Sequence, residues 1–563
     1  MRLPAALQLA FAALLILGPR TARAQVLPAP SPRIDPLAAE IERLVSGGAV
    51  STMRWQRFPD ANADVARLYG ARAWQPRWLE GARLGAGGVA LLARFAAAES
   101  LGLSPDDYDA SRLARTAAGY AAGRQPEPAE AARFDVALTV DAWRFYRALR
   151  FGRVSPHAAH GTFELPRDSV DFAATVDSLA DPALAGIVLA RAQPPFRHYR
   201  LLLESLAFYR KVAHDSTLVP VPAMPKTLRP GDGYRGAARL RALLSTLGDV
   251  PDSLLSIPAP AVEADTVYDA GLVAAVTGFQ RRHNLAADGA IGRQTQERLN
   301  RPFGDRIRQI VLSLERWRWL PHAYDAPPIF VNLPAFRLHA FRTLDDDETT
   351  MLSMDVVVGI AYKHDTPVFT APMRYVVFRP YWEVPISIMR AEIRPAALKN
   401  PSYVERQKFD LVRSGQVVPA TRANLEAIGG AVRVRQRPGP TNSLGNVKFM
   451  LPNPYNVYLH DTPAKSRFEV ERRDFSHGCI RLSQATALAE FVLRDQPEWT
   501  PRAIAAAMAG DEPKQVYLKH VIPVYVLYAT AIARQDGRTF FFDDLYGHDA
   551  TLDALLRRGY PYP

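Results

Sequence analysis

The feature that most constrains the fold is a change of hydrophobic period along the chain. From residue 37 to about residue 219 apolar residues recur at helical spacing, for example at Phe134, Leu138, Ala142, Phe145 and Leu149. A proline-rich break covers 220–230, and from residue 329 onward short β-branched and aromatic runs are typical of strands. This order predicts an α+β multidomain chain in which a helical region precedes a β-rich domain.

Within the β-rich region the pattern is interrupted once. Strands are predicted over 329–333, 336–341, 354–360, 373–378 and 447–451. Residues from about 387 to 437 lose strand character, are polar and favour helix, and an insertion of this size beside an active site is usually a lid. Further on, Gln535-Asp536-Gly537-Arg538 predicts a hairpin between 516–533 and 539–542, with strands that extend or buttress the same sheet.

Cys479 is the only cysteine among the 563 residues, so no intramolecular disulfide can engage its thiol. It stands in Ser476-His477-Gly478-Cys479-Ile480-Arg481, and His460 lies upstream in Tyr458-Leu459-His460-Asp461. A thiol reacts as the thiolate, and a nearby imidazole or guanidinium lowers its pKa from about 8.5. These neighbours favour a nucleophilic cysteine over a buried, inert thiol.

Strand alternation places these side chains together. If both runs are extended, Tyr458 and His460 share one face of the first, and His477, Cys479 and Arg481 share one face of the second. Same-face neighbours on one strand are about 6–7 Å apart, which is long for proton transfer from Cys479 to His477. His460 comes from another strand and can face the thiol, so we favour it as the base and expect His477 to shape the pocket.

The sequence pattern also suggests roles for four other side chains, but it does not fix all of them. Asp461 follows His460 directly and would point away from it, so we expect no Cys-His-Asp triad. Arg481 either binds a substrate carboxylate or holds the fold, and Trp382 either lines the cleft or packs in the core. Ser483 is expected to cap the helix that follows.

The motif resembles that of the L,D-transpeptidases, the cysteine enzymes that cross-link bacterial peptidoglycan. Their pattern is a histidine on one strand and, after a spacer, Ser/Thr-His-Gly-Cys-Ile/Val-Arg, which is matched in full from His460 to Arg481. The resemblance implies that Cys479 is the nucleophile, that His460 is the base and that a backbone carbonyl is the third partner. It also implies that Trp382 is an aromatic residue of the substrate cleft.

An oxyanion site completes the expected chemistry. Backbone N–H groups around Gly478 and Cys479, together with the Tyr458 hydroxyl, would hold the developing charge. Ser476 and His477 would complete the pocket.

Other segments resemble further parts of the long Gram-negative members of this family. Phe279-Gln280, Asp288-Gly289, Gly292, Thr295 and Leu299-Asn300 are similar to the signature of a three-helix peptidoglycan-binding module, although a generic helical core needs the same residues. We therefore expect a helical scaffold at 37–225, the module at 226–302 and a catalytic domain at 303–510 with a helical capping insertion at about 387–437. C-terminal strands at 511–563 are expected to pack on the catalytic domain.

The start of the chain predicts export. Arg2 precedes an apolar run from Ala5 to Leu17, and Ala22-Arg23-Ala24 is a small-x-small cleavage site. We predict a signal peptide at 1–24 that is cleaved after Ala24, a linker at 25–36 and a periplasmic location. The apolar run is too short for a comfortable membrane span.

The net charge of +12 agrees with a wall location better than with nucleic acid. In an exported protein such a charge favours anionic wall polymer or membrane surfaces. The expected partners are peptidoglycan stem peptides, with no nucleic acid. Peripheral association with the membrane or with cell-wall synthases is a further option.

The resemblance implies acyl transfer through a Cys479 thioester, from a tetrapeptide donor stem to an acceptor amine, with no cofactor or metal and with carbapenems as inhibitors. Three alternatives stay open at this point: an L,D-carboxypeptidase, an enzyme that attaches a protein to the wall, and a wall-binding protein without catalysis. A zinc enzyme with His460, His477 and Cys479 as ligands is a fourth, although no HExxH or CxxC spacing supports it.

Overall fold

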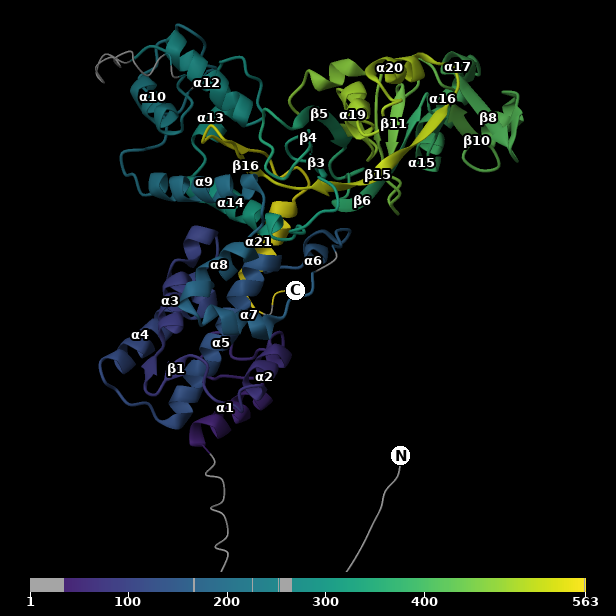
Figure 1. Cartoon of the computed structure of the whole chain (residues 1–563). Helices are drawn as coiled ribbons and strands as arrows, with labels where there is room; N and C mark the ends of the chain where they lie inside the picture. The colour runs from purple at the N-terminus through teal and green to yellow at the C-terminus, as the bar shows by residue number, and fades with distance from the viewer. Residues whose placement is uncertain are drawn as a thin grey trace, which may run out of the picture.

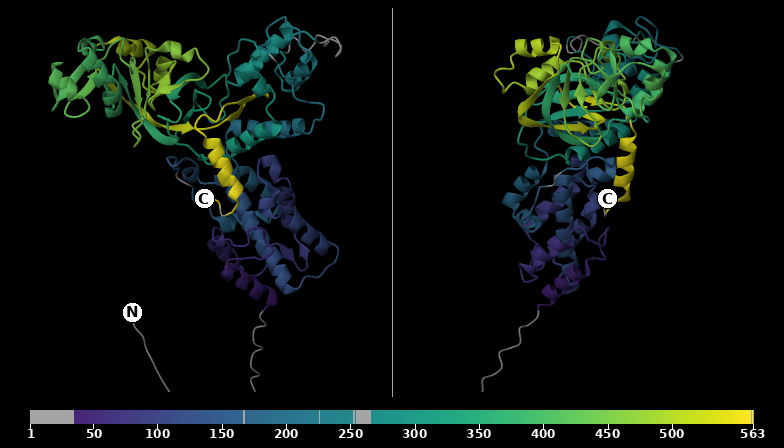
Figure 2. Two further views of the ribbon diagram at one scale, coloured as in Figure 1. Left: turned by 180° about the vertical axis from the view of Figure 1, so that it is seen from behind. Right: turned by 90° about the vertical axis from the view of Figure 1, so that its right-hand side faces the viewer.

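The computed structural model describes residues 35–165, 168–224, 226–251, 253, 266–560 and 562. The predicted signal peptide and all of the predicted linker up to residue 34 lie outside these residues. Two packed helices, α9 (Arg197–Ala213) and α14 (Phe303–Trp317), occupy the centre of the molecule. A helical domain lies at one end, and a small helical module and a β-rich domain lie on opposite sides of the other end (Figures 1 and 2).

The helical domain is built around one long helix that is buried along most of its length. This helix, α5 (Pro128–Phe151), begins at a proline and ends before Gly152, whose φ of 76° suits a helix end. The apolar positions predicted for it are all buried. The other described helices of the domain are α1 (Pro36–Gly47), α2 (Asn62–Gly70), α3 (Ala86–Ala96), α4 (Ala110–Ala121), α6 (Pro156–His160), α7 (Phe172–Leu179) and α8 (Pro182–Ala192).

The small module contains the helices α10 (Ala237–Thr246), α12 (Ala270–Arg282) and α13 (Arg293–Leu299). Its sequence signature forms one hydrogen-bond network around the buried amide of Gln280. The Nε2 group donates to the Ala290 carbonyl at 2.8 Å and to Thr295 Oγ1 at 3.2 Å, and Oε1 accepts the Gly289 N–H at 2.9 Å. The Gln, Asp-Gly and Thr positions of the signature therefore fix the turn between α12 and α13.

The β-rich domain contains a nine-stranded sheet whose order is β13-β5-β14-β12-β11-β6-β15-β3-β4. Strand β4 also pairs with β5, so the sheet closes on itself and all its strands except β13 form a ring. Because of this pairing, β4 does not leave an open sheet edge. The strands are β3 (Ile329–Asn332), β4 (Arg337–Ala340), β5 (Leu352–Gly359), β6 (Phe369–Phe378), β11 (Val447–Met450), β12 (Leu459–His460), β13 (Asp474–Ser476), β14 (Ile480–Leu482) and β15 (Lys514–Leu527). The predicted strands at 329–378 and 447–451 are confirmed.

A helix follows the last strand of the motif, but its cap differs from the prediction. Helix α19 (Ala485–Val492) has Gln484 at the N-cap position, and α20 (Pro501–Ala509) packs against it. Ser483 is not the cap, because its N–H continues the sheet by donating to the Asp355 carbonyl at 3.1 Å. Ser483 therefore continues the hydrogen-bonding pattern of the sheet.

We call residues 382–436 the cap; it is not purely helical, as predicted, but combines helix and sheet around its own apolar core. Its sheet has the order β7-β10-β8-β9, formed by β7 (Trp382–Glu383), β8 (Phe409–Arg413), β9 (Gln416–Val418) and β10 (Arg433–Gln436). All four strands are short, and β8 and β10 carry arginines at exposed or partly exposed positions, which hid their strand character. The helices are α15 (Ile386–Ile388), the π-helix Met389–Ile393, α16 (Arg394–Lys399), α17 (Ser402–Arg406) and α18 (Arg422–Glu426).

The C-terminal segment reaches beyond the catalytic sheet on which its strands were expected to pack. Strand β15 lies inside the sheet, between β6 and β3, while β16 (Ala531–Ala533) and β17 (Thr539–Phe541) form the predicted hairpin as a separate pair. The Arg282 guanidinium of the small module donates to the Thr539 carbonyl at 2.9 Å. Helix α21 (His548–Arg558) packs on α6 and α14, so this segment joins all parts of the molecule.

Glu315 on α14 ties the helical domain to the rest of the chain. Its side chain is fully buried and accepts the backbone N–H groups of Arg153 and Val154, the latter at 3.0 Å. It also pairs with the guanidinium groups of Arg153 at 3.4 Å and Arg318 at 3.5 Å. Two buried cations thus share one buried anion.

Replacing Glu315 by Gln is expected to lower the stability of the protein by about 3–5 kcal/mol, because it removes the buried carboxylate that Arg153 and Arg318 share and leaves Arg153 with Asp107, at 3.6 Å. Thermal unfolding of the full chain measures the effect. Glu297→Gln is the matched control, since Glu297 forms an exposed pair with Arg293 and its loss should have almost no effect. Equal melting temperatures for the two variants would contradict this role of Glu315.

Candidate active site

Three neighbouring strands place a row of polar side chains on one face of the sheet. Lys448 of β11 is paired with His460 of β12, and His460 is paired with Arg481 of β14. Paired residues point to the same face, while Leu459 and Ile480, one position earlier, are fully buried on the other. The predicted residues of β12 and β14 therefore lie on the same side of the sheet.

Cys479 lies just before β14, next to Tyr458 just before β12. The Ile480 N–H donates to the Tyr458 carbonyl at 3.1 Å, which extends the ladder toward the thiol, and Cys479 Sγ is 3.7 Å from the Asn456 carbonyl oxygen. Burial raises the pKa of the Cys479 thiol, and hydrogen bonds from the Tyr458 backbone and hydroxyl, with the charges of Arg481 and Lys448, oppose that rise. These four groups are positioned to stabilise a thiolate.

The run from 455 to 460 is not extended throughout, as the alternation assumed. Asn456 has a φ of 56°, in the left-handed region, and only the last two residues of the run form a strand. Val457 and Leu459 are nevertheless buried, so the expected faces hold from residue 457 onward.

His460 is buried and oriented by a backbone carbonyl. Its Nδ1 lies 2.5 Å from the Asp461 carbonyl oxygen, so Nδ1 is the donor and Nε2 keeps a free lone pair. Burial and then the charge of Arg481 lower the pKa of His460 to about 3, which keeps the ring neutral near pH 7. Within the described residues the contacts of the thiol are with Tyr458 and Asn456, and the role of His460 as base stays a prediction.

The Asp461 carboxylate is turned away from His460. It accepts from Lys465 Nζ at 2.7 Å and from the Asn446 N–H at 2.9 Å. The expectation that no Cys-His-Asp triad forms agrees with these contacts.

The turn that carries Cys479 is closed by Ser476. Ser476 Oγ donates to the Cys479 carbonyl at 2.6 Å and accepts the Gly478 N–H at 3.1 Å, while Thr366 Oγ1 donates to the Gly478 carbonyl at 2.9 Å. Gly478 has a φ of 108°, which favours glycine. Because the Gly478 N–H is already bonded, it is not available as the oxyanion donor that the sequence suggested, and the Cys479 N–H and the Tyr458 hydroxyl remain as candidates.

The same turn separates His477 from Cys479, so the two do not share a strand face as expected. His477 Nε2 lies 2.8 Å from Glu392 Oε1 of the cap, and its ring centroid is 5.0 Å from that of His364. His477 therefore connects the nucleophile turn to the cap. Within the part of the chain that the structure describes, no three His, Cys, Asp or Glu side chains are grouped to hold a metal ion, so the proposed zinc ligands are not brought together.

The two candidate substrate-binding residues border this site. Trp382 of β7 packs against the cap core and is hydrogen-bonded to the Tyr458 side chain, so it joins the cap to the pocket. Arg481 is half-buried, and its Nε finds no hydrogen-bond partner among the residues described. Burial lowers the pKa of Arg481. The choice between a substrate-binding and a structural role for Arg481 therefore stays a prediction.

Lys448 is the residue that the sequence interpretation missed. Burial lowers its pKa, the charges of Glu383 and Cys479 oppose that shift, and its Nζ lies 5.8 Å from the Tyr458 ring centroid. Alternation could have revealed it, since Val447, Phe449 and Leu451 are buried and a lysine between them must face the other way.

The fold places a cysteine, a neutral histidine and two cations on one side of the sheet next to the cap, and comparison with known proteins gives the family of this domain. Residues 327–514 match the L,D-transpeptidase catalytic domain, residues 63–206 match a family described as "Scaffold domain", and residues 238–299 match one described as "Putative peptidoglycan binding domain". The chain thus carries a scaffold domain, a peptidoglycan-binding domain and an L,D-transpeptidase catalytic domain, in this order, and the predicted family is confirmed.

One curated relative adds to this result. A "Putative L,D-transpeptidase" of Haemophilus influenzae is 28% identical over 249 residues, which are 44% of this chain and 49% of the relative. The chain therefore spans about half the length of the curated relative it matches. Among the described residues, no helix combines the length and the apolar character needed to cross a membrane.

Replacing Lys448 by Met should move the pH midpoint of Cys479 alkylation by iodoacetamide upward by about one unit, because a cation near the thiolate is lost. Second-order alkylation rates measured across pH 6–10 test this. Lys519→Met, which removes an exposed lysine from β15 of the same sheet, should leave the profile unchanged. An unshifted midpoint in the Lys448 variant would exclude the electrostatic role.

Proposed function

We propose that this chain is a cysteine L,D-transpeptidase that cross-links peptidoglycan stem peptides through a Cys479 thioester. The observation that carries the proposal is the single row of Lys448, His460 and Arg481 beside Cys479 and Tyr458, in a domain that matches the family. In the first step the Cys479 proton passes to His460 Nε2, and the sulfur attacks the carbonyl carbon next to the terminal D-alanine of a donor tetrapeptide.

The two half-reactions then use the same groups in opposite directions. The tetrahedral oxyanion accepts hydrogen bonds from the Cys479 N–H and the Tyr458 hydroxyl, and the C–N bond breaks as D-alanine leaves with the proton from His460. An acceptor amine attacks the thioester, His460 takes its proton, and the sulfur leaves and is reprotonated. His460 is neutral near pH 7, so its Nε2 is unprotonated before the reaction, while the burial that lowers its pKa to about 3 weakens it as a base.

The cellular setting is part of the proposal. We infer export to the periplasm with cleavage after Ala24, and binding of the wall by the peptidoglycan-binding domain at 238–299. A positive net charge of +12 favours contact with anionic wall polymers.

Incubation of the purified chain with a carbapenem should give one covalent adduct in intact-protein mass spectra, because the β-lactam carbonyl acylates the same thiolate as the donor stem. The Cys479→Ala variant should give none. Muropeptides from cells that express the protein should contain new cross-links; trimmed stems alone would indicate a carboxypeptidase. Unmodified protein, or an adduct that persists in Cys479→Ala, would refute the proposed nucleophile.

Glu392→Gln should raise KM for the donor by up to about fivefold with little change in kcat, because the exposed His477–Glu392 pair holds the cap and such pairs contribute at most about 1 kcal/mol. Steady-state release of D-alanine from a tetrapeptide measures both constants. Glu405→Gln serves as control, since Glu405 pairs with Lys408 within the cap and with Arg437 directly after it. A fall in kcat at constant KM would argue against a role in cap closure.

A further inference from the structure

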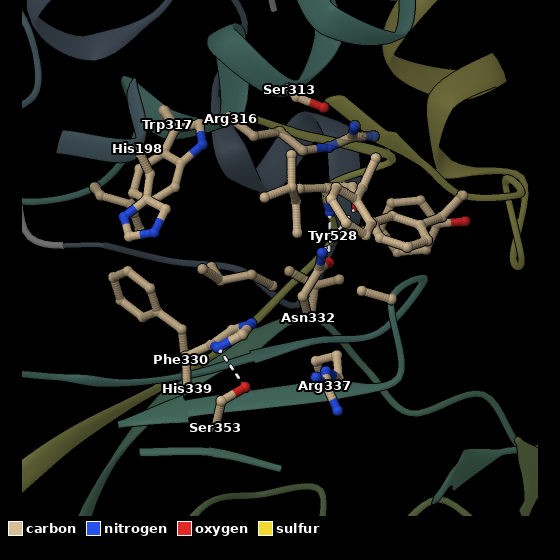
Figure 3. Close-up of a pocket in the computed structure, with 18 of the residues that line it drawn as sticks. His198, Ser313, Arg316, Trp317, Phe330, Asn332, Arg337, His339, Ser353 and Tyr528 are labelled. Atoms are coloured by element: carbon tan, nitrogen blue, oxygen red, sulfur yellow. Dashed lines mark hydrogen bonds between the residues drawn. The ribbon is translucent and has the colours of Figure 1, made fainter. Parts of the chain in front are cut away.

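A second cavity lies at the junction of the domains, apart from Cys479. It has a volume of about 200 Å³ and is lined by α9, α14, the strands β3 to β5 and the C-terminal segment after β15. Figure 3 shows His198 and Trp317 on one side of it and Phe330, His339 and Ser353 on the other. None of its lining residues belongs to the site around Cys479.

The cavity walls are largely apolar. Aromatic and aliphatic side chains from several parts of the fold line the space: Trp317, Phe330, Phe341, Leu527, Ile532 and Phe540. A space of this size holds far more than one water molecule, which needs only about 10–15 Å³ by the same measure. The walls therefore suit an apolar body rather than isolated waters.

The charged groups at the cavity are mostly cationic. Arg316, Arg337 and Arg534 line it, against the single carboxylate of Glu348. Arg316 pairs with Asp549 and Arg337 with Asp355, whereas the Arg534 guanidinium stacks on the Phe540 ring at 3.8 Å. The charge of the lining is thus complementary to an anion, with Arg534 as its least constrained cation.

Several side chains at the cavity have polar atoms without hydrogen-bond partners in the described part of the chain, namely those of His160, His198, Arg316 and Trp319. Arg316 is 7% exposed, and its Nε and Nη2 are unpaired; His198 is 7% exposed, and its Nδ1 is unpaired. Buried polar groups are normally hydrogen-bonded, so these unpaired atoms show that the wall of the cavity is not satisfied by its own side chains. Burial, with Arg337, His198 and Arg534 as charged neighbours, also lowers the pKa of His339 to about 3.

We propose that this cavity binds a small amphiphilic anion, a molecule with an aromatic or short aliphatic body and one carboxylate, phosphate or sulfonate group. The apolar body would fill the space between Trp317 and Phe330, and the anion would meet Arg534 and Arg337. Because the lining comes from α9, α14, the sheet and the β16–β17 hairpin, the bound molecule stabilises the junction of the domains by mass action. The site does not depend on the chemistry at Cys479.

The probe pair 8-anilinonaphthalene-1-sulfonate and N-phenyl-1-naphthylamine tests this on the full chain, because the two fluorophores share an apolar body and differ in the sulfonate. The sulfonate probe should bind saturably at one site, and the neutral probe at least tenfold more weakly. Arg534→Gln should weaken the sulfonate probe about tenfold. Arg538→Gln, in the same hairpin but paired with Asp536 and outside the cavity, should change binding by less than twofold.

A steric variant and two competitors complete the test. Ile532→Trp should fill the cavity and abolish saturable binding while near-UV circular dichroism confirms the fold. Decanoate should displace the sulfonate probe and raise the melting temperature, and inorganic phosphate should do neither. Equal binding of both probes, unchanged binding in Arg534→Gln, or displacement by phosphate as effective as by decanoate would overturn the proposal. Cys479→Ala protein should bind the sulfonate probe as the unchanged protein does. This result would show that the cavity binds its ligand independently of the proposed catalytic function.

Discussion

The active site depends on the pairing of a strand of only two residues. Strand β12 is hydrogen-bonded to β11 on one side and β14 on the other, and this double pairing aligns Lys448, His460 and Arg481. A shift of one residue in either register would turn one of these side chains into the core, where Leu459 and Ile480 are fully buried. The apolar partners on the inner face therefore fix the position of the polar groups on the outer one.

The sequence predicted which way a side chain faces where the site is built from regular strands. It did not predict this where the site is built from turns. Leu459, His460, Ile480 and Arg481 obey alternation, because regular strands leave a residue only two faces. The positive φ at Gly478 breaks the rule, so His477 turns toward Glu392 instead of lying beside the thiol. Turn closure by a serine side chain leaves no periodic signal, and the same closure removed the Gly478 N–H from the oxyanion site.

Contacts between the domains could not be predicted from the sequence, because they too lack a local pattern. Helices, strands and the module signature were visible because they repeat locally, whereas the contacts between domains join residues more than one hundred positions apart. Glu315 accepts a hydrogen bond from Val154, which lies that far away in the sequence, and the hairpin after β15 accepts one from Arg282. The cavity between these parts arises only from their mutual arrangement, so no single segment of sequence carries its pattern.

The nucleophile turn is anchored on two sides by different kinds of contact. Ser476 and Thr366 hold it to the sheet through hydrogen bonds, and His477 holds it to the cap through a partly exposed contact with Glu392. Buried hydrogen bonds are costly to leave unpaired, while exposed ion pairs break readily in water. The contact with the cap is therefore the weaker of the two anchors, and the position of Cys479 relative to His460 and Arg481 depends mainly on the buried one.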